Sequence, residues 1–298
     1  MSRWPGIHRR WHGYTLIELM VALSVGGLAM TGMLQAYALG RAGYEQVQST
    51  ARLHEQALYV FSALEADLQM AGYYGLVSAA DAPDTTAVSD RAAGCGQGLA
   101  QQLAQAVSLS DGYYPLRCRA DGGGWLPGSD VLTVRRASAS TGRADSGRLQ
   151  LLTQVPGDGP SRLIANGLVP ADCPSAGGRC ELRDLLVHIY YVARYADGSS
   201  VNDRLPALRL KSLTRVAGTA TFVDTEVLPG IQDLQLQAGF TTGNSATLRY
   251  VAAGQLPADA KLHAVRLSIT LVAARAHSGK QPRLTLTRTF ALRNMVSA

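Results

Sequence analysis

The sequence predicts an α+β protein in which one long N-terminal helix packs on an antiparallel β-sheet head with long loops. Three observations predict this fold. An apolar, charge-free run lies near the N-terminus, apolar residues then recur at helical spacing up to residue 68, and short alternating segments follow from residue 130 onward. We expect three parts: a leader over residues 1–13, a helix over residues 14–71 and a β-rich head over residues 72–298.

Residues 19–40 have the length and composition of a membrane-spanning helix. They include no Asp, Glu, Lys or Arg, in a chain with 28 basic and 22 acidic residues. At the helical rise this run covers about 33 Å, enough for the roughly 30 Å core of a bilayer. We therefore expect a spanning part at about residues 17–40 and an amphipathic part at residues 41–71. One such segment excludes a purely soluble cytoplasmic protein and a polytopic membrane protein.

The amphipathic part shows apolar residues that step by four and three, as on one face of an α-helix. No proline interrupts Tyr14 to Met70, and Gly72 is the expected stop. We interpret His54 as a packed helix residue and not as a metal ligand. The predicted stripe consists of Val47, Ala51, His54, Leu58, Phe61, Leu64 and Leu68.

The rest of the chain predicts strands after a long loop region. Residues 72–125 are rich in Gly, Ala, Ser and Asp and show little periodicity. Later segments alternate: Leu284, Leu286 and Phe290 share one face, and threonines occupy the other. Residues 276–282 suit a hairpin connection. The expected strands are residues 130–136, 148–155, 185–195, 207–212, 221–228, 233–240, 247–251, 264–273 and 283–292.

All four cysteines lie in the head: Cys95, Cys118, Cys173 and Cys180. An even count in a chain with an export segment predicts two disulfides in an oxidising compartment. Three pairings are possible, and loop-closure entropy favours the neighbouring pairs, Cys95 with Cys118 and Cys173 with Cys180. There is no CxxC motif and no histidine at ligand spacing, so we expect no zinc site. We expect no other metal and no cofactor.

The N-terminal flank has charges that fix its orientation. Residues 1–13 contain Arg3, Arg9 and Arg10 and no acid, so this flank stays cytoplasmic and the head faces outward. Glu18 stands at the start of the apolar helix, where a carboxylate is costly in lipid and indicates a functional residue. A secretory signal cut near residues 36–38 and an uncleaved signal anchor are the alternatives.

The residues Gly13-Tyr14-Thr15-Leu16-Ile17-Glu18-Leu19-Met20 resemble the class III signal of type IV pilins and type II secretion pseudopilins. The resemblance implies that a prepilin peptidase cuts between Gly13 and Tyr14 and that Tyr14 is then N-methylated. It also implies that Glu18 neutralises the terminal amine of a neighbouring subunit, since either charge would be costly alone in apolar surroundings. The family usually has Phe where this chain has Tyr14, and Lys or Arg where it has His12.

Three later segments resemble the PilW minor pilins: residues 228–237 (LPGIQDLQLQ), 264–269 (AVRLSI) and 290–294 (FALRN). This resemblance implies a structural, non-enzymatic subunit that joins other minor pilins and the major pilin, primes the pilus and stays near its tip, with a PilY-type adhesin. It implies roles in adhesion and twitching motility. Before assembly the subunit would be in the bacterial inner membrane with its head in the periplasm, and afterwards in the pilus at the cell surface. A GspJ-like pseudopilin of type II secretion is the first alternative.

A DNA-binding pilin used in DNA uptake is the second alternative. Residues 261–298 contain basic side chains and no acid, and a basic sheet face can hold phosphates. Arginines are scattered throughout the chain and aromatic partners are sparse in this region, so DNA is not the favoured partner. The candidate phosphate contacts are Arg266, Arg275, Lys280, Arg283 and Arg288.

Catalysis and calcium binding have little support in the sequence. The histidines of the head, His188, His263 and His277, have no nucleophile signature such as GxSxG nearby, so we expect no enzyme. No GxxxxGK[ST] loop occurs, so motive force would come from a separate ATPase. Asp81, Asp84 and Asp90 match no EF-hand spacing and indicate a solvated loop.

Overall fold

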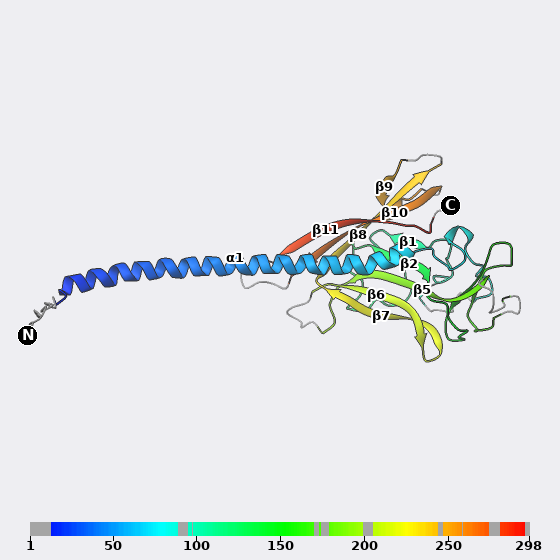
Figure 1. Cartoon of the computed structure of the whole chain (residues 1–298), viewed down its shortest axis with the longest axis horizontal. Helices are drawn as coiled ribbons and strands as arrows, with labels where there is room; N and C mark the ends of the chain where they lie inside the picture. The colour runs from blue at the N-terminus through cyan, green and yellow to red at the C-terminus, as the bar shows by residue number, and fades with distance from the viewer. Residues whose placement is uncertain are drawn as a thin grey trace, which may run out of the picture. The chain divides into compact units, whose positions relative to one another are not determined.

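Figure 1 shows the computed structural model, which describes residues 13–88, 95–96, 98–169, 173, 179–198, 205–243, 247–257, 259–273 and 281–295. It consists of one long helix, α1 (Leu16–Met70), and two antiparallel sheets, which is the α+β architecture predicted from the sequence. Contacts divide the chain into two compact units, residues 1–49 and 50–298. The part of α1 from Thr50 onward therefore folds together with the sheets.

The larger sheet has seven strands, with β5 at its centre. Strand β5 pairs with β2 through residues 185–190, with β3 through residues 180–184 and with β6 through residues 188–193. Strand β1 pairs with β2, β4 with β3, and β7 with β6. The bounds are β1 (Val107–Ser110), β2 (Val131–Ala137), β3 (Gln150–Gln154), β4 (Arg162–Ile164), β5 (Cys180–Ala193), β6 (Ala207–Val216) and β7 (Thr219–Pro229).

The smaller sheet has four strands in the order β11-β10-β8-β9. Its strands are β8 (Ile231–Thr242), β9 (Arg249–Ala252), β10 (Ala260–Val272) and β11 (Arg283–Ala291), with a short helix, η2 (Ala253–Gln255), between β9 and β10. Strands β10 and β11 form the predicted hairpin. Gly230 lies where the chain passes from β7 to β8. It has φ +86°, and a Cβ there would lie 2.7 Å from the Val272 carbonyl oxygen, so this crossing requires glycine.

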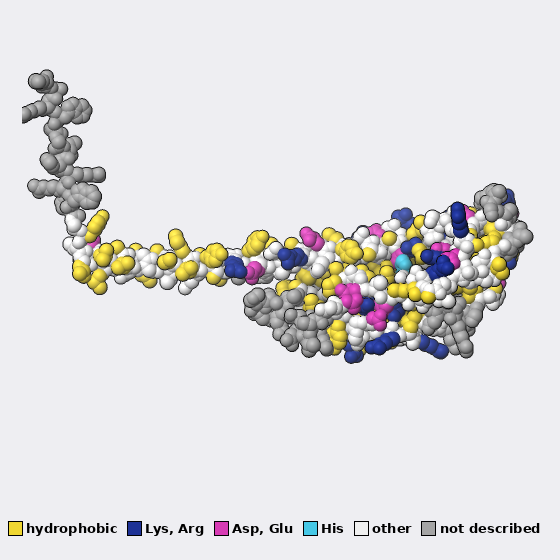
Figure 2. Space-filling model, turned by 90° about the horizontal axis from the view of Figure 1, so that it is seen from below, with side chains coloured by type: hydrophobic (Ala, Val, Ile, Leu, Met, Phe, Trp, Pro, Cys, Tyr) yellow, Lys and Arg dark blue, Asp and Glu magenta, His cyan; other side chains and the backbone are white. Residues whose placement is uncertain are grey.

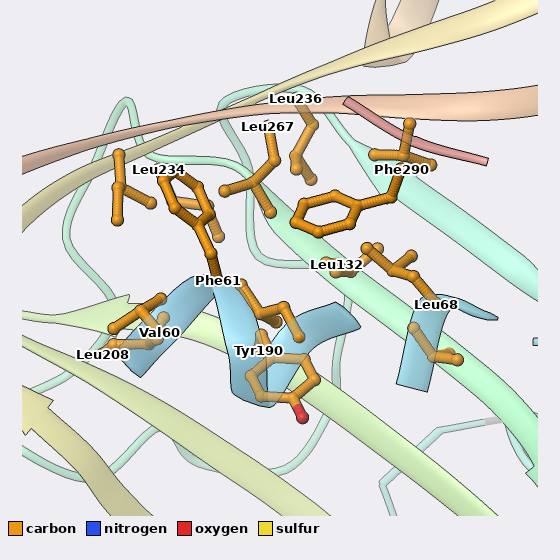
Figure 3. Close-up of a cluster of buried hydrophobic side chains, with 14 of the residues drawn as sticks. Val60, Phe61, Leu68, Leu132, Tyr190, Leu208, Leu234, Leu236, Leu267 and Phe290 are labelled. Atoms are coloured by element: carbon orange, nitrogen blue, oxygen red, sulfur yellow. The ribbon is translucent and has the colours of Figure 1, made fainter. Parts of the chain in front are cut away.

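The C-terminal part of α1 is buried between the two sheets, which lie on either side of it in Figure 1. Figure 3 shows Val60, Phe61 and Leu68 of the helix in one cluster with side chains from both sheets. A second core covers the opposite face of the larger sheet, under the loops of residues 72–125, and includes Tyr74 and Leu103. Both faces of the larger sheet are therefore covered. The sheet residues in the Figure 3 cluster include Leu132, Tyr190, Leu208, Leu234, Leu236, Leu267 and Phe290.

The predicted helix stripe is wrong in part. Phe61, Leu64 and Leu68 are buried, but Leu58 is 60% exposed and Val47 is 70% exposed. His54 and Ala51 are exposed too, so His54 is not a packed residue. Apolar residues occur all round this helix, so a second series at the same spacing fits the sequence equally well. That second series is the one that packs: Leu53, Ala57, Val60, Leu64 and Leu68.

Each of the nine predicted strands is present, with bounds that differ by up to five residues at an end. Strand β5 begins at Cys180, before the predicted start at residue 185, because it also pairs with β3 there. Two strands were not predicted. Strands β1 and β4 are only four and three residues long and lie among loop-like sequence, so alternation gave no signal for them. The loop region also contains the short helix η1 (Ala79–Asp81).

We predict that Leu64→Ala lowers the free energy of unfolding by about 2–5 kcal/mol, because Leu64 is fully buried and its truncation leaves a cavity. Leu58→Ala is the matched control on the same helix. Its side chain is largely exposed, so the loss should stay near 0.5 kcal/mol or below. Urea denaturation of the full chain in detergent measures both. Equal losses for the two variants would show that the buried face is assigned wrongly.

Candidate functional site

The residues expected at the processing site are exposed. The Tyr14 side chain is 88% exposed, and the space around Gly13 is open. Both residues precede the first turn of α1 and are not part of a helix or strand. A peptidase needs an accessible bond in a non-helical segment. The bond between Gly13 and Tyr14 meets that requirement.

Glu18 has a local role that was missed in the sequence. The Thr15 main-chain N–H donates to Glu18 Oε2 at 3.4 Å, and the Glu18 main-chain N–H donates to Thr15 Oγ1 at 3.3 Å. This reciprocal pair is a capping box, which satisfies two of the free N–H groups at a helix start. The pattern Thr-x-x-Glu before an apolar run was the available signal. Both distances are long for hydrogen bonds, so the cap holds Glu18 weakly.

The first part of α1 exposes an apolar surface. Leu23, Leu28 and Met33 are 69%, 74% and 76% exposed, and Figure 2 shows hydrophobic side chains along this part of the helix. Among the described residues, one helix is long enough and apolar enough to cross a membrane, and that helix is α1. Contiguous apolar surface of this extent is unfavourable in water. It therefore needs lipid or another protein around it.

Two disulfides hold loops of the head. Cys95 pairs with Cys118 and Cys173 with Cys180, which is the predicted neighbouring pairing. The first bridge closes a segment over the second core, and the Arg117 N–H adds a main-chain hydrogen bond to the Cys95 carbonyl at 2.9 Å. The second bridge joins Cys173 to the first residue of β5. The first bridge thus joins two loop segments to each other, and the second ties a loop to the larger sheet.

A buried carboxylate joins α1 to the larger sheet. The Asp67 residue is only 3% exposed. Arg136 of β2 donates to Asp67 Oδ1 at 2.8 Å. The Tyr190 hydroxyl of β5 donates to Asp67 Oδ2 at 2.5 Å, and His188 Nδ1 of β5 lies 2.5 Å from the same oxygen. The cluster of Asp67, Arg136, His188 and Tyr190 is called the helix lock below.

The charge state of Asp67 follows from these partners. Burial opposes the carboxylate charge, but the hydrogen bonds from His188 and Tyr190 and the nearby charges of His188 and Arg136 outweigh it, so the pKa of Asp67 is lowered. Burial and the Asp67 charge both raise the pKa of Tyr190, so its hydroxyl stays protonated and donates. His188, expected to be a packed or surface strand residue, is half-buried and bonded to Asp67. The helix lock was missed because its members are far apart in sequence.

A second buried charge cluster lies between β6 and β7. Asp224 accepts hydrogen bonds from Arg209 Nε at 2.8 Å and from the Tyr191 hydroxyl at 2.5 Å, and it pairs with Lys211 Nζ at 2.6 Å. Lys211 also donates to the Arg119 carbonyl at 2.7 Å, which fixes the overlying loop. Burial opposes the charge of Asp224, but these bonds together lower its pKa. The cluster is internally paired, so it serves as a structural tie.

The candidate phosphate contacts do not share one face. In the register of β10 and β11, Arg266 and Arg283 lie on one face and Arg288 on the other. Arg266 stacks on the Tyr250 ring at 3.7 Å, and Arg288 pairs with Glu65 of α1 at 3.0 Å. Arg275 and Lys280 lie outside the described residues. The described members therefore give no continuous basic face.

The aspartates considered for calcium are only partly described. Asp84 accepts hydrogen bonds from the Thr86 main chain at 3.0 Å and from its hydroxyl at 2.9 Å, as in a local turn. Asp81 is exposed, and Asp90 lies outside the described residues. Within the described part of the chain, no group of three or more His, Cys, Asp or Glu side chains is placed to hold a metal ion.

Among known protein families, the model of the prokaryotic N-terminal methylation motif matches residues 10–34 of this chain. No curated protein and no solved structure matches the chain. The matched segment includes Gly13, Tyr14 and Glu18 and the apolar start of α1. This prepilin-type motif, with the long helix and the antiparallel head, supports a type IV pilin- or pseudopilin-like protein. The motif and the apolar helix are consistent with membrane anchoring before assembly.

We predict that Asp67→Asn lowers the free energy of unfolding at pH 7 by about 3–5 kcal/mol, because it leaves Arg136 and His188 facing a neutral partner. The folded pKa of Asp67 lies below its ordinary value of 3.8. The contribution of the Asp67 charge to the free energy of unfolding is therefore complete at pH values above 3.8, and it is lost as the pH falls through the folded pKa. The difference in the free energy of unfolding between wild type and Asp67→Asn should shrink when the pH is lowered to about 2.

Urea denaturation of the full chain in detergent, repeated from pH 7 down to about pH 2, gives this difference directly. Asp81→Asn is the matched control, because Asp81 is exposed. Its free energy of unfolding should equal that of the wild type at each pH. A pH-independent deficit for Asp67→Asn would mean that lost packing, and not lost charge, causes the destabilisation.

Proposed function

We propose that the protein is a minor pilin of the PilW type, which helps to prime type IV pilus assembly and sits in a minor-pilin complex near the pilus tip. The observation that carries this proposal is the prepilin-type motif at residues 10–34 on a helix that continues without a break to Met70. A cleavable motif at the start of such a helix serves to deliver a folded head to a helical assembly. The role is structural, so we propose no enzymatic activity.

The head favours a minor subunit over a simple anchor. Its two sheets bury the end of α1 in one core, so the helix and the head form one folded unit from Thr50 onward. The PilW-like segment at residues 228–237 is the crossing from β7 to β8, where Gly230 is required. The other two PilW-like segments lie on β10 and at the end of β11. These resemblances therefore fall on the smaller sheet that covers the helix.

Processing would change the partners of Glu18. Cleavage after Gly13 by a prepilin peptidase turns Tyr14 into a charged N-terminus, which is then methylated. Within the described part of the intact chain, Glu18 is held only by the long capping bonds with Thr15. A bond to the terminal ammonium of a neighbouring subunit, in which both groups are charged, is stronger than a long capping bond in which only the carboxylate is charged. Assembly would thus exchange a weak local partner for a strong one in another subunit.

The partners would be other minor pilins, the major pilin and, near the tip, a PilY-type adhesin. Leu58 and Tyr59 are 60% and 57% exposed on the part of α1 that belongs to the head. Exposed apolar side chains on a helix suit contacts with the helices of neighbouring subunits. The protein would reside in the inner membrane with a periplasmic head before assembly, and in the surface pilus afterwards, where it supports adhesion and twitching motility.

Type II secretion offers the second candidate, a GspJ-like pseudopilin, because the methylation motif is shared by both systems. The DNA-binding alternative has less support, since Arg266 and Arg288 lie on opposite faces of the smaller sheet. Genes that encode minor pilins and a PilY-type protein beside this one favour the pilus. Genes for a secretion system favour the pseudopilin.

We predict that the mature chain begins at N-methylated Tyr14. Mass spectrometry of the N-terminal peptide, from protein extracted from membranes, measures this directly. A strain without prepilin peptidase is the control and should give the intact Met1 terminus. A start near Leu39 in cells with the peptidase would indicate an ordinary secretory signal, and an intact Met1 there would indicate a plain membrane anchor.

We predict that Glu18→Ala and Glu18→Gln both leave cleavage largely intact and both reduce incorporation into filaments by about tenfold or more. Gln keeps the capping bond of the capping box but removes the charge. Glu18→Gln therefore separates helix capping from charge pairing. The amount of each variant in sheared filaments, relative to the membrane fraction, gives the result. Wild-type incorporation of Glu18→Gln would contradict charge pairing between subunits.

A further inference from the structure

Strand β1 is an edge of the larger sheet and pairs with β2 alone. The Arg135 N–H donates to the Ala106 carbonyl at 2.7 Å, so the antiparallel alternation directs the main-chain groups of Ser108 toward β2. By the same alternation, Val107 and Leu109 direct their N–H and C=O groups away from the sheet. Within the described residues no hydrogen bond engages these outward groups. A free strand edge of this kind is a template for another strand.

Two hollows meet along this free edge. The larger, of about 520 Å³, lies between β1 and the segment that runs from η2 into β10. The smaller, of about 400 Å³, is lined by the other face of β1 and by the loop that the Cys95–Cys118 bridge closes. Gln105, Ser108 and Leu109 line both hollows, so the space continues around the edge of β1. Each volume lies in the range of about 300–1,000 Å³ that is typical of binding sites.

The two hollows differ in polarity in a way that suits a strand. Successive side chains of an added strand point to opposite faces, so alternate residues would enter each hollow. Most residues that line the larger hollow are apolar, with Leu256, Leu262 and Met295 among them. The smaller is more polar and includes Gln102 and Thr133.

The charged side chains in the described lining of the two hollows are all positive. Lys261 lies at the larger hollow and Arg117 at the smaller, and both side chains are exposed. Neither cation pairs with a carboxylate of the described residues. The described lining of the two hollows contains no Asp or Glu. An occupant with acidic side chains would therefore complement both cations.

We propose that the free edge of β1 and the two hollows form a docking slot for an extended, acidic segment of a partner polypeptide, which adds to the sheet as a strand beside β1. The main-chain groups of Val107 and Leu109 bond to the main chain of this segment. Its apolar side chains enter the larger hollow, its carboxylates meet Arg117 at the smaller hollow, and the exposed Lys261 beside the larger hollow attracts its negative charge. The slot lies wholly in the unit of residues 50–298, so its use does not depend on processing at Gly13.

The probe is a set of fluorescent peptides of about ten residues in which Val, Leu or Ile alternates with Glu, Asp or Thr. Fluorescence anisotropy with the full chain in detergent micelles measures binding. The matched control peptides are identical except for N-methyl groups on alternate amides, in either phase, which remove the main-chain donors. We expect at least one peptide of the set to bind and one phase of N-methylation to weaken its binding about tenfold or more.

Leu109→Pro and Leu109→Ala test the strand edge itself. Both remove the leucine side chain, but only Pro removes the outward N–H, and edge strands tolerate Pro at such positions. We expect Leu109→Pro to bind about tenfold more weakly than Leu109→Ala, and Lys261→Glu to weaken acidic peptides further. If Leu109→Pro does not fold, as judged by thermal unfolding, the N-methylated peptides and Lys261→Glu still decide the question.

Three outcomes would overturn the proposal. No peptide of the set binds, or the N-methylated peptides bind as well as the parents, or Leu109→Pro and Leu109→Ala bind equally when both are folded. A chain ending at Met295 identifies a competing occupant. If it binds the peptides when the full chain does not, residues 296–298 take the slot and no partner segment is needed.

Discussion

The buried carboxylate of Asp67 is the contact on which the arrangement of the head depends. An ionised group in an apolar core is tolerated only where partners surround it. Arg136, His188 and Tyr190 surround Asp67 when α1 has one particular orientation about its own axis. In that orientation Leu64 points into the core and Leu58 points to the surface. Hydrophobic burial stabilises the core, but by itself it does not decide which face of α1 is buried, because α1 carries apolar residues on all of its sides. The helix lock supplies the selection.

The same helix joins the two functional parts of the chain. Its start carries the methylation motif and the capping box of Thr15 and Glu18, and its end lies in the core of the head. A change at Glu18 therefore leaves the core of the head intact, and a change at Asp67 leaves the motif intact. The Cys95–Cys118 bridge closes the loop that lines the proposed slot at β1, and Lys211 of the paired cluster around Asp224 bonds to the Arg119 carbonyl beside that bridge. The motif and the proposed slot thus consist of separate groups of residues.

Local patterns predicted most of the fold. The helix, the hairpin of β10 and β11 and the disulfide pairing follow from periodicity, turn residues and loop closure, all of which act over short distances. The helix lock could not be predicted, since 121 residues separate Asp67 from His188 and no local rule links them. The buried face was missed for the same reason. The capping box at Thr15 and Glu18 was readable and was overlooked. The free edge of β1 required the three-dimensional fold, because a strand of four residues leaves no alternation to detect.

We propose that the methylation motif at residues 10–34 delivers this head into a surface filament. The most direct measurement is quantitative mass spectrometry of sheared filaments, with the number of copies expressed per major pilin, in cells with and without prepilin peptidase. We expect a small, reproducible number of copies per filament when the peptidase is present and none in the sheared fraction when it is absent. A protein that stays wholly in the inner membrane while the major pilin is processed and assembled would contradict it.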